Sequence, residues 1–284
     1  MRIEPLANGE KLSLSYEDEE LRLFFIGTGS AFSKILNQTN LLIIKGKDHL
    51  LVDCGTKTPQ ALHSIGCPLS NIRNYFLTHT HADHIGGVEE VCLTSRYMKK
   101  KKPAICIPEY FENILWDYSL AGGAAYNERT GGKPLTFGDF WEIKRPVWAA
   151  GYPRETWEAD IGSINLKIFR TMHIPDSAST WEDSFPSFGL VIDNIILFSS
   201  DTRFDPDMVR DYGSNKKIQA IFHDCQFFTG GVHSSLEELS TLPKDIRAKT
   251  YLMHYQDSWE KVLPAVEEAG FAGFARQHVY YIFP

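Results

Sequence analysis

The chain has 284 residues, enough to bury roughly three quarters of its unfolded surface. Its hydrophobic content of 43% and charged content of 23% are ordinary for a globular protein, and no apolar run is long enough to span a membrane. The net charge of −7 argues against a broad nucleic-acid-binding surface, which would be basic. The basic run YMKKKKP at 97–103 fits a solvated helix end, where lysines suit the helix dipole and Pro103 stops the helix.

The opening stretch MRIEPLANGEKLSLSYEDEE is polar and acidic and has no signal-peptide core, so we expect a cytoplasmic protein. The five cysteines include no CxxC pair, which favours reduced and mostly buried thiols.

Apolar runs that end at glycine predict successive strands at 21–27, 40–46 and 49–55. Helical spacing follows at 58–66, a buried strand at 74–78, a helix at 84–100, a strand at 104–108 and a helix at 109–120. The stretch 121–134 has turn chemistry throughout and is the best candidate for a mobile loop or lid. The second half repeats the alternation in segments 164–173, 187–193, 195–201, 217–225, 234–243, 249–254 and 259–270. This pattern predicts an α/β protein with stacked sheets covered by helices.

The segment YFLTHTHADHIGG at 75–87 crowds ligand-type side chains directly after an apolar run. His79 and His81 are two residues apart, so in an extended segment they project to the same side. Asp83 and His84 follow where the next helix begins, and the glycines at 86–87 let that helix pass close to the site. Imidazole suits zinc, manganese or iron, and carboxylates suit harder ions. One loop can therefore serve two metal ions; the alternative is a polar loop of hydrogen-bonded histidines.

Three further ligand-type residues stand where an apolar strand meets a polar loop: His173, Asp201 and His254. Alone, each fits a structural residue with a satisfied hydrogen bond. Together with the 79–84 cluster, they predict a second set of metal ligands.

These residues, in this order, resemble the metallo-β-lactamase superfamily, and the resemblance runs from GTGSA at 27–31 and LLVDCG at 50–55 to His254. It implies an α/β fold, the four-layer αββα sandwich, as a single domain over 1–284 with the site along one edge of the two sheets. The implied ligands of one metal are His79, His81 and His173, and those of the other are Asp83, His84 and His254, with Asp201 bridging. Asp53 is then either a residue that orients a ligand histidine or the cap of the loop at 55–58.

Asp201 argues against the β-lactamases proper, which lack an aspartate at the bridging position. FIGTGSAF at 25–32 resembles the phosphodiesterase branch that contains tRNase Z. By that resemblance the catalytic residues are His233, Asp224 and Asp83: His233 donates a proton to the leaving oxygen and Asp224 orients it. The branch has glutamate where Asp224 stands. The alternative for His233 is a loop histidine before an N-cap at Ser234; His223 has no assigned role, and His49, His63 and His278 are interpreted as structural.

Within this branch, GTGSAF, HADHIGG, HDCQFF, GVHSSLEEL and MHYQD resemble the anti-Pycsar proteins of phages and bacteria. The resemblance implies two divalent ions, zinc or else manganese, and hydrolysis of 3′,5′-cyclic nucleotides to nucleoside monophosphates, which counters antiphage signalling. It also implies a cytoplasmic homodimer, in the host cytoplasm if phage-encoded. A loop at 116–134 bearing Trp116, Tyr118 and Tyr126 would close over the partner's site, or else pack on its own subunit.

The sequence also allows other functions. A tRNA 3′-processing endonuclease is disfavoured because the chain is acidic and shows no long Gly/Pro-rich arm. A thioesterase or lactonase of the same superfamily is the other enzymatic alternative, and a non-catalytic metal-binding scaffold would require a lost ligand. We expect a small-molecule partner, no stable nucleic-acid complex and no membrane association.

Overall fold

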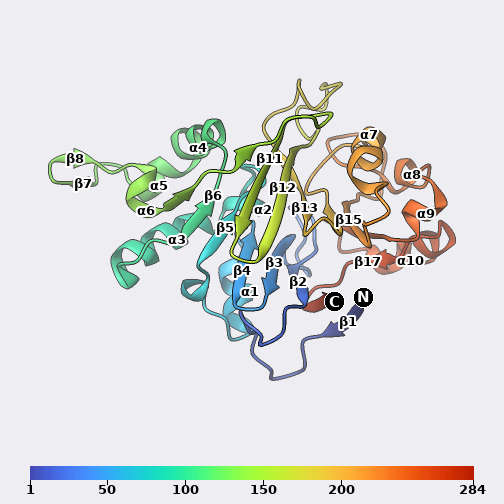
Figure 1. The fold of residues 1–284 in the computed structure, drawn as a ribbon, viewed down its shortest axis with the longest axis horizontal. Coiled ribbons are helices and arrows are strands. Elements are labelled where there is room, and N and C mark those ends of the chain that lie inside the picture. The colour runs from blue at the N-terminus through green and yellow to red at the C-terminus, as the bar shows by residue number, and fades with distance from the viewer. The chain divides into compact units, whose positions relative to one another are not determined.

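A computed structural model describes residues 1–284, which form two compact units (Figure 1). The 40–146 unit comprises Arg2–Ile26, Asn40–Pro146 and His278–Pro284. The 147–277 unit comprises Met1, Gly27–Thr39 and Val147–Gln277. Each unit has its own eight-stranded sheet. None of the helices is long and apolar enough to cross a membrane.

The sheet of the 40–146 unit has the strand order β1-β18-β2-β3-β4-β5-β6-β9. Its strands are β1 (Arg2–Pro5), β2 (Leu21–Gly27), β3 (Asn40–Lys45), β4 (Asp48–Val52), β5 (Asn74–Phe76), β6 (Ala104–Cys106), β9 (Glu142–Lys144) and β18 (Val279–Phe283). A two-stranded ribbon, β7 (Arg129–Thr130) and β8 (Lys133–Pro134), completes the strands of this unit. Strands β2 and β6 are buried throughout, which explains why β6 is wholly apolar and β2 is apolar except for Arg22.

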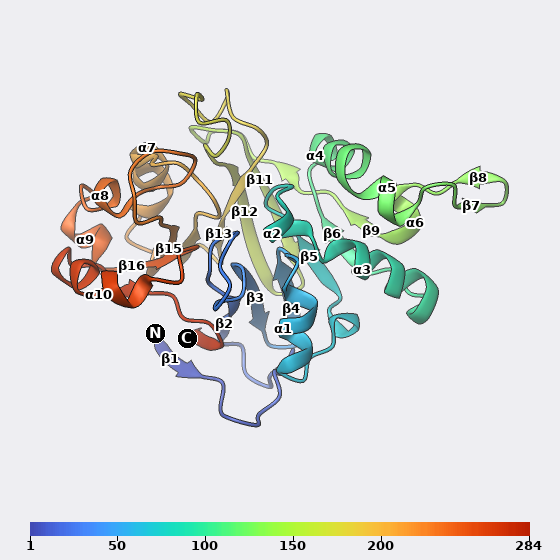
Figure 2. The same cartoon turned by 180° about the vertical axis from the view of Figure 1, so that it is seen from behind.

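The helices of the 40–146 unit connect these strands. They are α1 (Thr58–Ser64), α2 (Ala82–Ile85), α3 (Val88–Leu93), α4 (Glu109–Leu115), α5 (Ala121–Ala124) and α6 (Phe137–Phe140), with a 3₁₀ turn at Leu69–Asn71 and π-helical segments at Thr94–Lys99 and Trp116–Leu120. Figure 2 shows α1 and α3 on the near face of this sheet. The β7–β8 ribbon extends away from the sheet in both views (Figures 1 and 2).

The sheet of the 147–277 unit has the order β10-β11-β12-β13-β14-β15-β16-β17. Its strands are β10 (Val147–Trp148), β11 (Thr156–Ile161), β12 (Ile164–Arg170), β13 (Phe188–Ile192), β14 (Ile196–Phe198), β15 (Ala220–Asp224), β16 (Thr250–Met253) and β17 (Gly273–Phe274). The helices are α7 (Pro206–Met208), α8 (Leu236–Leu239), α9 (Lys244–Arg247) and α10 (Trp259–Glu268), with a π-helical segment at Val209–Gly213. Their apolar residues share one buried cluster with strand residues such as Phe169, Ile221 and Leu252.

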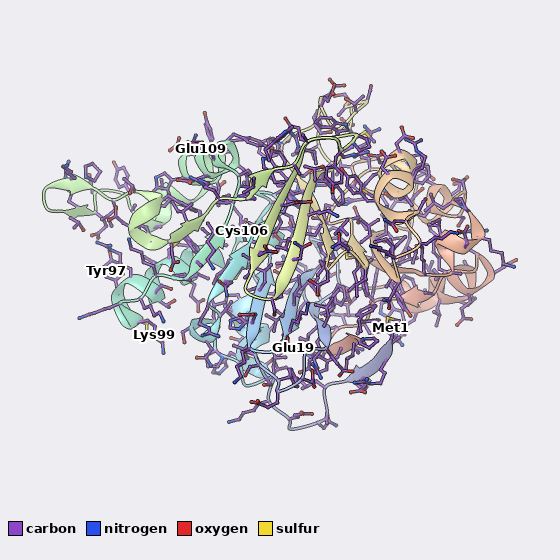
Figure 3. The ribbon with its side chains drawn as sticks, viewed as in Figure 1. Met1, Glu19, Tyr97, Lys99, Cys106 and Glu109 are labelled. Carbon is purple, nitrogen blue, oxygen red and sulfur yellow. The ribbon has the colours of Figure 1, made fainter.

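Two predicted elements differ from the structure. The helix expected over 84–100 begins at Ala82 and is divided into α2, α3 and a π-helical segment that ends at Lys99. Lys100 adopts a left-handed conformation, so the helix stops before Pro103 is reached. Figure 3 labels Tyr97 and Lys99 at this end. The stretch 121–134 is not irregular throughout, because it contains α5 and the β7–β8 ribbon.

The prediction of buried, unpaired thiols is confirmed. All five cysteines are free and buried. Burial raises the pKa of Cys67 to about 11 and that of Cys92 to about 12, so both thiols are protonated at neutral pH.

Candidate metal centre

Two parallel strands of the 40–146 unit end side by side and begin the site. In the β4–β5 pairing, Val52 is opposite Phe76, so the residues that follow these strands meet at one edge of the sheet. Asp53 comes directly after β4 and has a left-handed backbone with φ of 65°. A non-glycine residue in this conformation is held there by its surroundings. Its buried carboxylate accepts hydrogen bonds from the backbone N–H (2.8 Å) and the hydroxyl (2.8 Å) of Thr78.

The same carboxylate orients one predicted ligand. Oδ2 of Asp53 lies 2.7 Å from Nδ1 of His84, which leaves Nε2 of that imidazole to face a metal. Burial raises the pKa of Asp53, and the imidazole of His84 opposes part of this rise. Of the two roles expected for Asp53, the contact with His84 therefore supports the one in which it orients a ligand histidine. The cap position of α1 is Lys57, and α1 has no side-chain cap.

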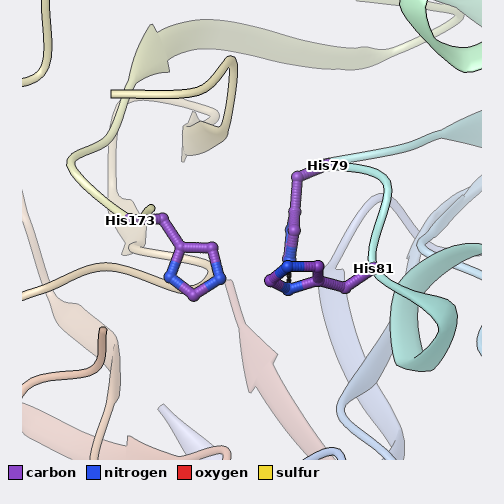
Figure 4. A group of neighbouring side chains, drawn as sticks. All are labelled: His79, His81 and His173. Carbon is purple, nitrogen blue, oxygen red and sulfur yellow. Dashed lines mark hydrogen bonds between the residues drawn. The ribbon is translucent and has the colours of Figure 1, made fainter. Parts of the chain in front are cut away.

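The other ligands of this unit lie close by. Figure 4 shows His79 and His81, whose Nε2 and Nδ1 atoms are 3.1 Å apart. Nδ1 of His79 lies 3.1 Å from the hydroxyl of Thr78. Asp83 and His84 are both on α2, with 3.2 Å between the Asp83 Oδ2 and His84 Nε2 atoms. Helix α2 thus starts inside the motif, and one turn presents both side chains.

The glycine pair at 86–87 serves the loop that carries Asp53. A Cβ atom on Gly86 would lie 2.2 Å from the hydroxyl of Thr56, and one on Gly87 would lie 2.9 Å from Sγ of Cys54. The chain between α2 and α3 therefore passes tightly against the segment after β4. These glycines were expected to let the helix pass close to the site. The close approach they allow is to the segment after β4, which carries Asp53.

The second set of predicted ligands gathers at one sheet edge of the 147–277 unit. Strands β14, β15 and β16 are parallel, with Phe198 opposite Phe222 and Asp224 opposite Met253. The carboxyl ends of these strands present Asp201, Asp224 and His254 at one edge. Ser200 and His254 have left-handed backbones, with φ of 54° and 59°. Such strained positions cluster at functional sites.

Four side chains of this unit form a group that can hold a metal ion. Asp201, Asp224, His233 and His254 each offer one ligand atom, and these atoms lie within 4.8 Å of one another. Nε2 of His254 is 3.3 Å from Oδ2 of Asp201, and its Nδ1 is 3.5 Å from Oδ1 of Asp224. Imidazoles and carboxylates at these spacings are suitable ligands for a divalent ion such as zinc, and all but His233 are buried.

His173 belongs to the same edge. It follows β12, is fully buried, and its Nε2 lies 3.9 Å from Oδ2 of Asp201. Its Nδ1 is 2.9 Å from the carbonyl oxygen of Val232, to which it donates. A backbone acceptor at Nδ1 fixes the tautomer that leaves Nε2 for a metal. Figure 4 includes the His173 ring on its loop.

His233 and Asp224 form a hydrogen-bonded pair. Nδ1 of His233 lies 2.8 Å from Oδ2 of Asp224, which is fully buried and also accepts from the backbone N–H of Thr202 at 3.0 Å. Burial alone would lower the pKa of His233, but the Asp224 carboxylate reverses this and raises it. His233 keeps 21% of its side chain exposed, so its ring can reach a bound molecule.

Neighbouring residues clarify two further predictions. The N-cap of α8 is Ser235, with a capping box to Glu238, and not Ser234. His223 is fully buried, its Nδ1 lies 2.8 Å from the Asp224 carbonyl oxygen, and burial lowers its pKa. A neutral, buried imidazole bonded to the backbone acts as a structural residue that holds the strand end.

Sequence reasoning missed the groups that support the ligands. Thr78 bonds to both Asp53 and His79, and its position before the HTH motif was the available clue. The carbonyl of Val232 supports His173, and the hydroxyl of Ser199 accepts from the backbone N–H of Asp224 at 2.9 Å. Apart from the contact of Thr78 with its neighbour His79, these contacts link residues far apart in the chain, so local patterns did not indicate them.

The predicted ligands divide between the units. The 40–146 unit carries His79, His81, Asp83 and His84, and the 147–277 unit carries His173, Asp201 and His254 with the Asp224–His233 pair. Both sets offer atoms that suit a divalent ion, namely carboxylate oxygens and imidazole nitrogens. His84 and His173 are oriented by hydrogen bonds at Nδ1, to Asp53 and to the Val232 carbonyl.

The chain is similar to known proteins over most of its length. The chain is 35% identical over 258 residues to the anti-Pycsar protein Apyc1 of Bacillus phage BSP38, covering 89% of this chain and 96% of that protein. It is 32% identical over 265 residues to the protein of the same name from Paenibacillus xerothermodurans, covering 93% and 98%.

Among solved structures, the metallo-β-lactamase fold protein YhfI from Bacillus subtilis matches with a TM-score of 0.67 at 13% identity, covering 93% of this chain and 100% of that one. The α/β fold class predicted from the sequence, that of the metallo-β-lactamases, is therefore confirmed. The family model of the anti-Pycsar protein Apyc1 matches residues 21–281. The chain belongs to the anti-Pycsar protein Apyc1 family.

Proposed function

We propose that this protein is a metal-dependent phosphodiesterase, a hydrolase that opens 3′,5′-cyclic nucleotides to nucleoside monophosphates and so counters cyclic-nucleotide antiphage signalling. The observation that carries the proposal is the His233–Asp224 pair, 2.8 Å apart, beside the predicted metal ligands Asp201 and His254. A metal site that only bound an ion would not need a partly exposed imidazole with a raised pKa beside it. Family membership supports the same reaction class.

The proposal places two divalent ions, zinc or manganese, in the combined ligand set. His79, His81 and His173 would hold one, Asp83, His84 and His254 the other, and Asp201 would bridge them. When bound, such ions supply Lewis acidity to a phosphoryl group and activate water at neutral pH. Asp83 would serve both as a ligand and in catalysis, because its carboxylate lies at the N-terminal turn of α2 beside His84.

His233 is the proposed general acid. The departing ribose oxygen is a poor leaving group and needs a proton, which a positioned imidazole can donate from Nε2 while Nδ1 stays bonded to Asp224. The raised pKa keeps the imidazole protonated at neutral pH to a larger extent than an ordinary histidine. Asp224 is a positioning residue, held by Thr202 and Ser199.

We further propose that the protein acts as a homodimer in the cytoplasm and that segment 116–134 closes over a site. Tyr118 and Tyr126 support this because their side chains are 85% and 78% exposed. Trp116 contributes differently: its ring packs 5.8 Å from that of Phe137 and 5.7 Å from that of Phe140, inside its own unit. The contact surface of the segment would therefore be the two tyrosines.

A substrate panel tests the proposal. The metal-loaded protein is incubated with 3′,5′-cyclic nucleotides, a precursor tRNA, a thioester, a lactone and nitrocefin, and consumption of each is followed by chromatography. We expect only the cyclic nucleotides to be consumed, with nucleoside monophosphates as products. Accurate cleavage of precursor tRNA at its 3′ trailer at physiological salt would instead establish a tRNA-processing enzyme. Turnover of the thioester or lactone alone would overturn the phosphodiesterase assignment.

A further inference from the structure

The loop at 28–39 of the 147–277 unit presents a large apolar side chain to solvent. Phe32 is 86% exposed, and Ile35, on the same loop, is 80% exposed. Exposed apolar surface is unfavourable in water, and Phe32 and Ile35 expose two large apolar side chains on one loop. Other aromatic residues of this unit, such as Phe169 and Tyr255, are buried in a shared core, whereas Phe32 is exposed.

The backbone of this loop is fixed to the segment that follows the ligand His254. The backbone N–H of Ser30 donates to the Tyr255 carbonyl at 3.0 Å, and that of Tyr255 donates to Thr28 at 3.3 Å. The carboxylate of Asp257 accepts from three consecutive backbone N–H groups, those of Lys34 (2.7 Å), Ile35 (3.2 Å) and Leu36 (3.2 Å). Phe32 therefore stands on a loop that is anchored on both sides, next to a predicted metal ligand.

A second loop, 226–235, is anchored on the same segment and carries the proposed general acid. The backbone N–H of Phe227 donates to the Gln256 side chain at 3.1 Å, and the Phe227 ring stacks 6.4 Å from that of Tyr255. The backbone N–H of Gln226 donates to Ser234 at 2.8 Å, which closes the loop. The next residue, Phe228, is 61% exposed, and His233 follows in the same loop.

We propose that Phe32 and Phe228 are the stacking surface for the nucleobase of the substrate. The inference rests on the proposed function and names the residues that would bind the base. Both loops are held by residues 255–257, directly after His254, and one of them also carries the proposed general acid His233. In a cyclic nucleotide the base lies within one ribose of the oxygen that His233 would protonate. Stacking uses the face common to all bases and requires no base-specific hydrogen bond.

The proposal gives a distinct kinetic result. Phe32→Ala and Phe228→Ala should each raise the KM for a cyclic nucleotide by about 10-fold with little change in kcat, because stacking binds substrate and transition state alike. Phe32→Trp should keep the wild-type KM. Methyl p-nitrophenyl phosphate, which has no nucleobase, should be hydrolysed equally by all variants. Val147→Ala, which truncates a 71% exposed side chain on β10, is the matched control.

Binding without turnover is the second measurement. Calorimetry with a 3′,5′-cyclic nucleotide phosphorothioate should show the same loss of affinity in Phe32→Ala and Phe228→Ala, with unchanged metal content. Unchanged KM and affinity would overturn the stacking surface, as would equal losses on both substrates. A change of oligomeric state in size-exclusion chromatography would show instead that these side chains contact a second copy of the chain. If the wild type neither binds nor opens any cyclic nucleotide, the proposed function itself fails, which is a different result from an unaffected variant.

Discussion

Nδ1 of His233 lies 2.8 Å from Oδ2 of Asp224, a carboxylate that is fully buried at the end of β15. Burial alone would raise the pKa of Asp224, but the His233 imidazole lowers it, so the pair is an ionised carboxylate beside a histidine with a raised pKa. The first expected outcome follows from this pair. His233→Ala should lower turnover of a cyclic nucleotide by about 100-fold, because the alkoxide leaving group loses its proton donor.

The same variant should hydrolyse an activated diester with a nitrophenolate leaving group nearly as well as wild type, since that group departs without a proton. Asp224→Asn should show a milder form of the same selectivity. Stopped assays on both substrates, with elemental analysis to verify metal content, check the result. Equal losses on the two substrates would mean that His233 is a metal ligand or a structural residue.

A second prediction concerns the bridging position. Fully loaded protein should contain two divalent ions per chain, and Asp201→Ala should lose at least one of them together with activity, because its carboxylate is the proposed link between the ions. Elemental analysis after gel filtration measures the ratio. Asp207→Ala, which truncates an exposed carboxylate of α7, should keep both ions. A fully active Asp201→Ala protein would exclude the two-ion assignment.

A third prediction concerns the residue behind His84. Asp53→Asn should weaken metal binding by about 10- to 100-fold, because the Nδ1 atom of His84 loses its carboxylate partner at 2.7 Å. Competition with a chromophoric chelator measures the affinity of each variant. Asp117→Asn, at an exposed position of the 116–134 segment, is the control and should bind metal like wild type. Wild-type affinity in Asp53→Asn would show that His84 is oriented by its packing alone.

A fourth prediction concerns stability at low pH. Burial, assisted by the nearby Arg73 cation, lowers the pKa of His49 to about 4, and its Nε2 accepts from the Arg73 backbone N–H at 3.0 Å. In the unfolded chain the pKa is about 6.5, so protons bind the unfolded state more tightly. The free energy of unfolding should therefore fall as the pH drops from about 6.5 to about 4, by about 3 kcal/mol from this residue.

Urea unfolding of the wild type and His49→Gln between these pH values tests the linkage. Glutamine offers an acceptor but does not titrate, so the variant should lose about that much less stability over the interval. His63→Gln, at an exposed position of α1, should retain the wild-type pH dependence. Parallel curves for His49→Gln and the wild type would show that His49 does not titrate differently on folding.

By itself, the sequence determined the ligand types and their spacing. The HTHADH motif places two histidines on an extended segment and Asp83 with His84 on one helical turn, which are local geometries. Apolar runs also indicated most strands that a site residue follows, such as β5, β12 and β16. Strands without a strong apolar run were missed. The exposed strand β1 exists because it pairs with β18, more than 270 positions along the chain, as in the pairing of Arg2 with Ile282.

Only the tertiary structure decided which group forms the hydrogen bond that orients each ligand histidine. Asp53 reaches His84 because β4 and β5 are parallel and end together, and the Val232 carbonyl reaches His173 across 59 positions of sequence. The exposed position of Phe32 also depends on distant residues, because Tyr255 and Asp257 hold the backbone of its loop. A sequence pattern reports spacing along one strand or helix, whereas hydrogen bonds and stacking surfaces depend on where distant segments meet, and strand pairing sets that.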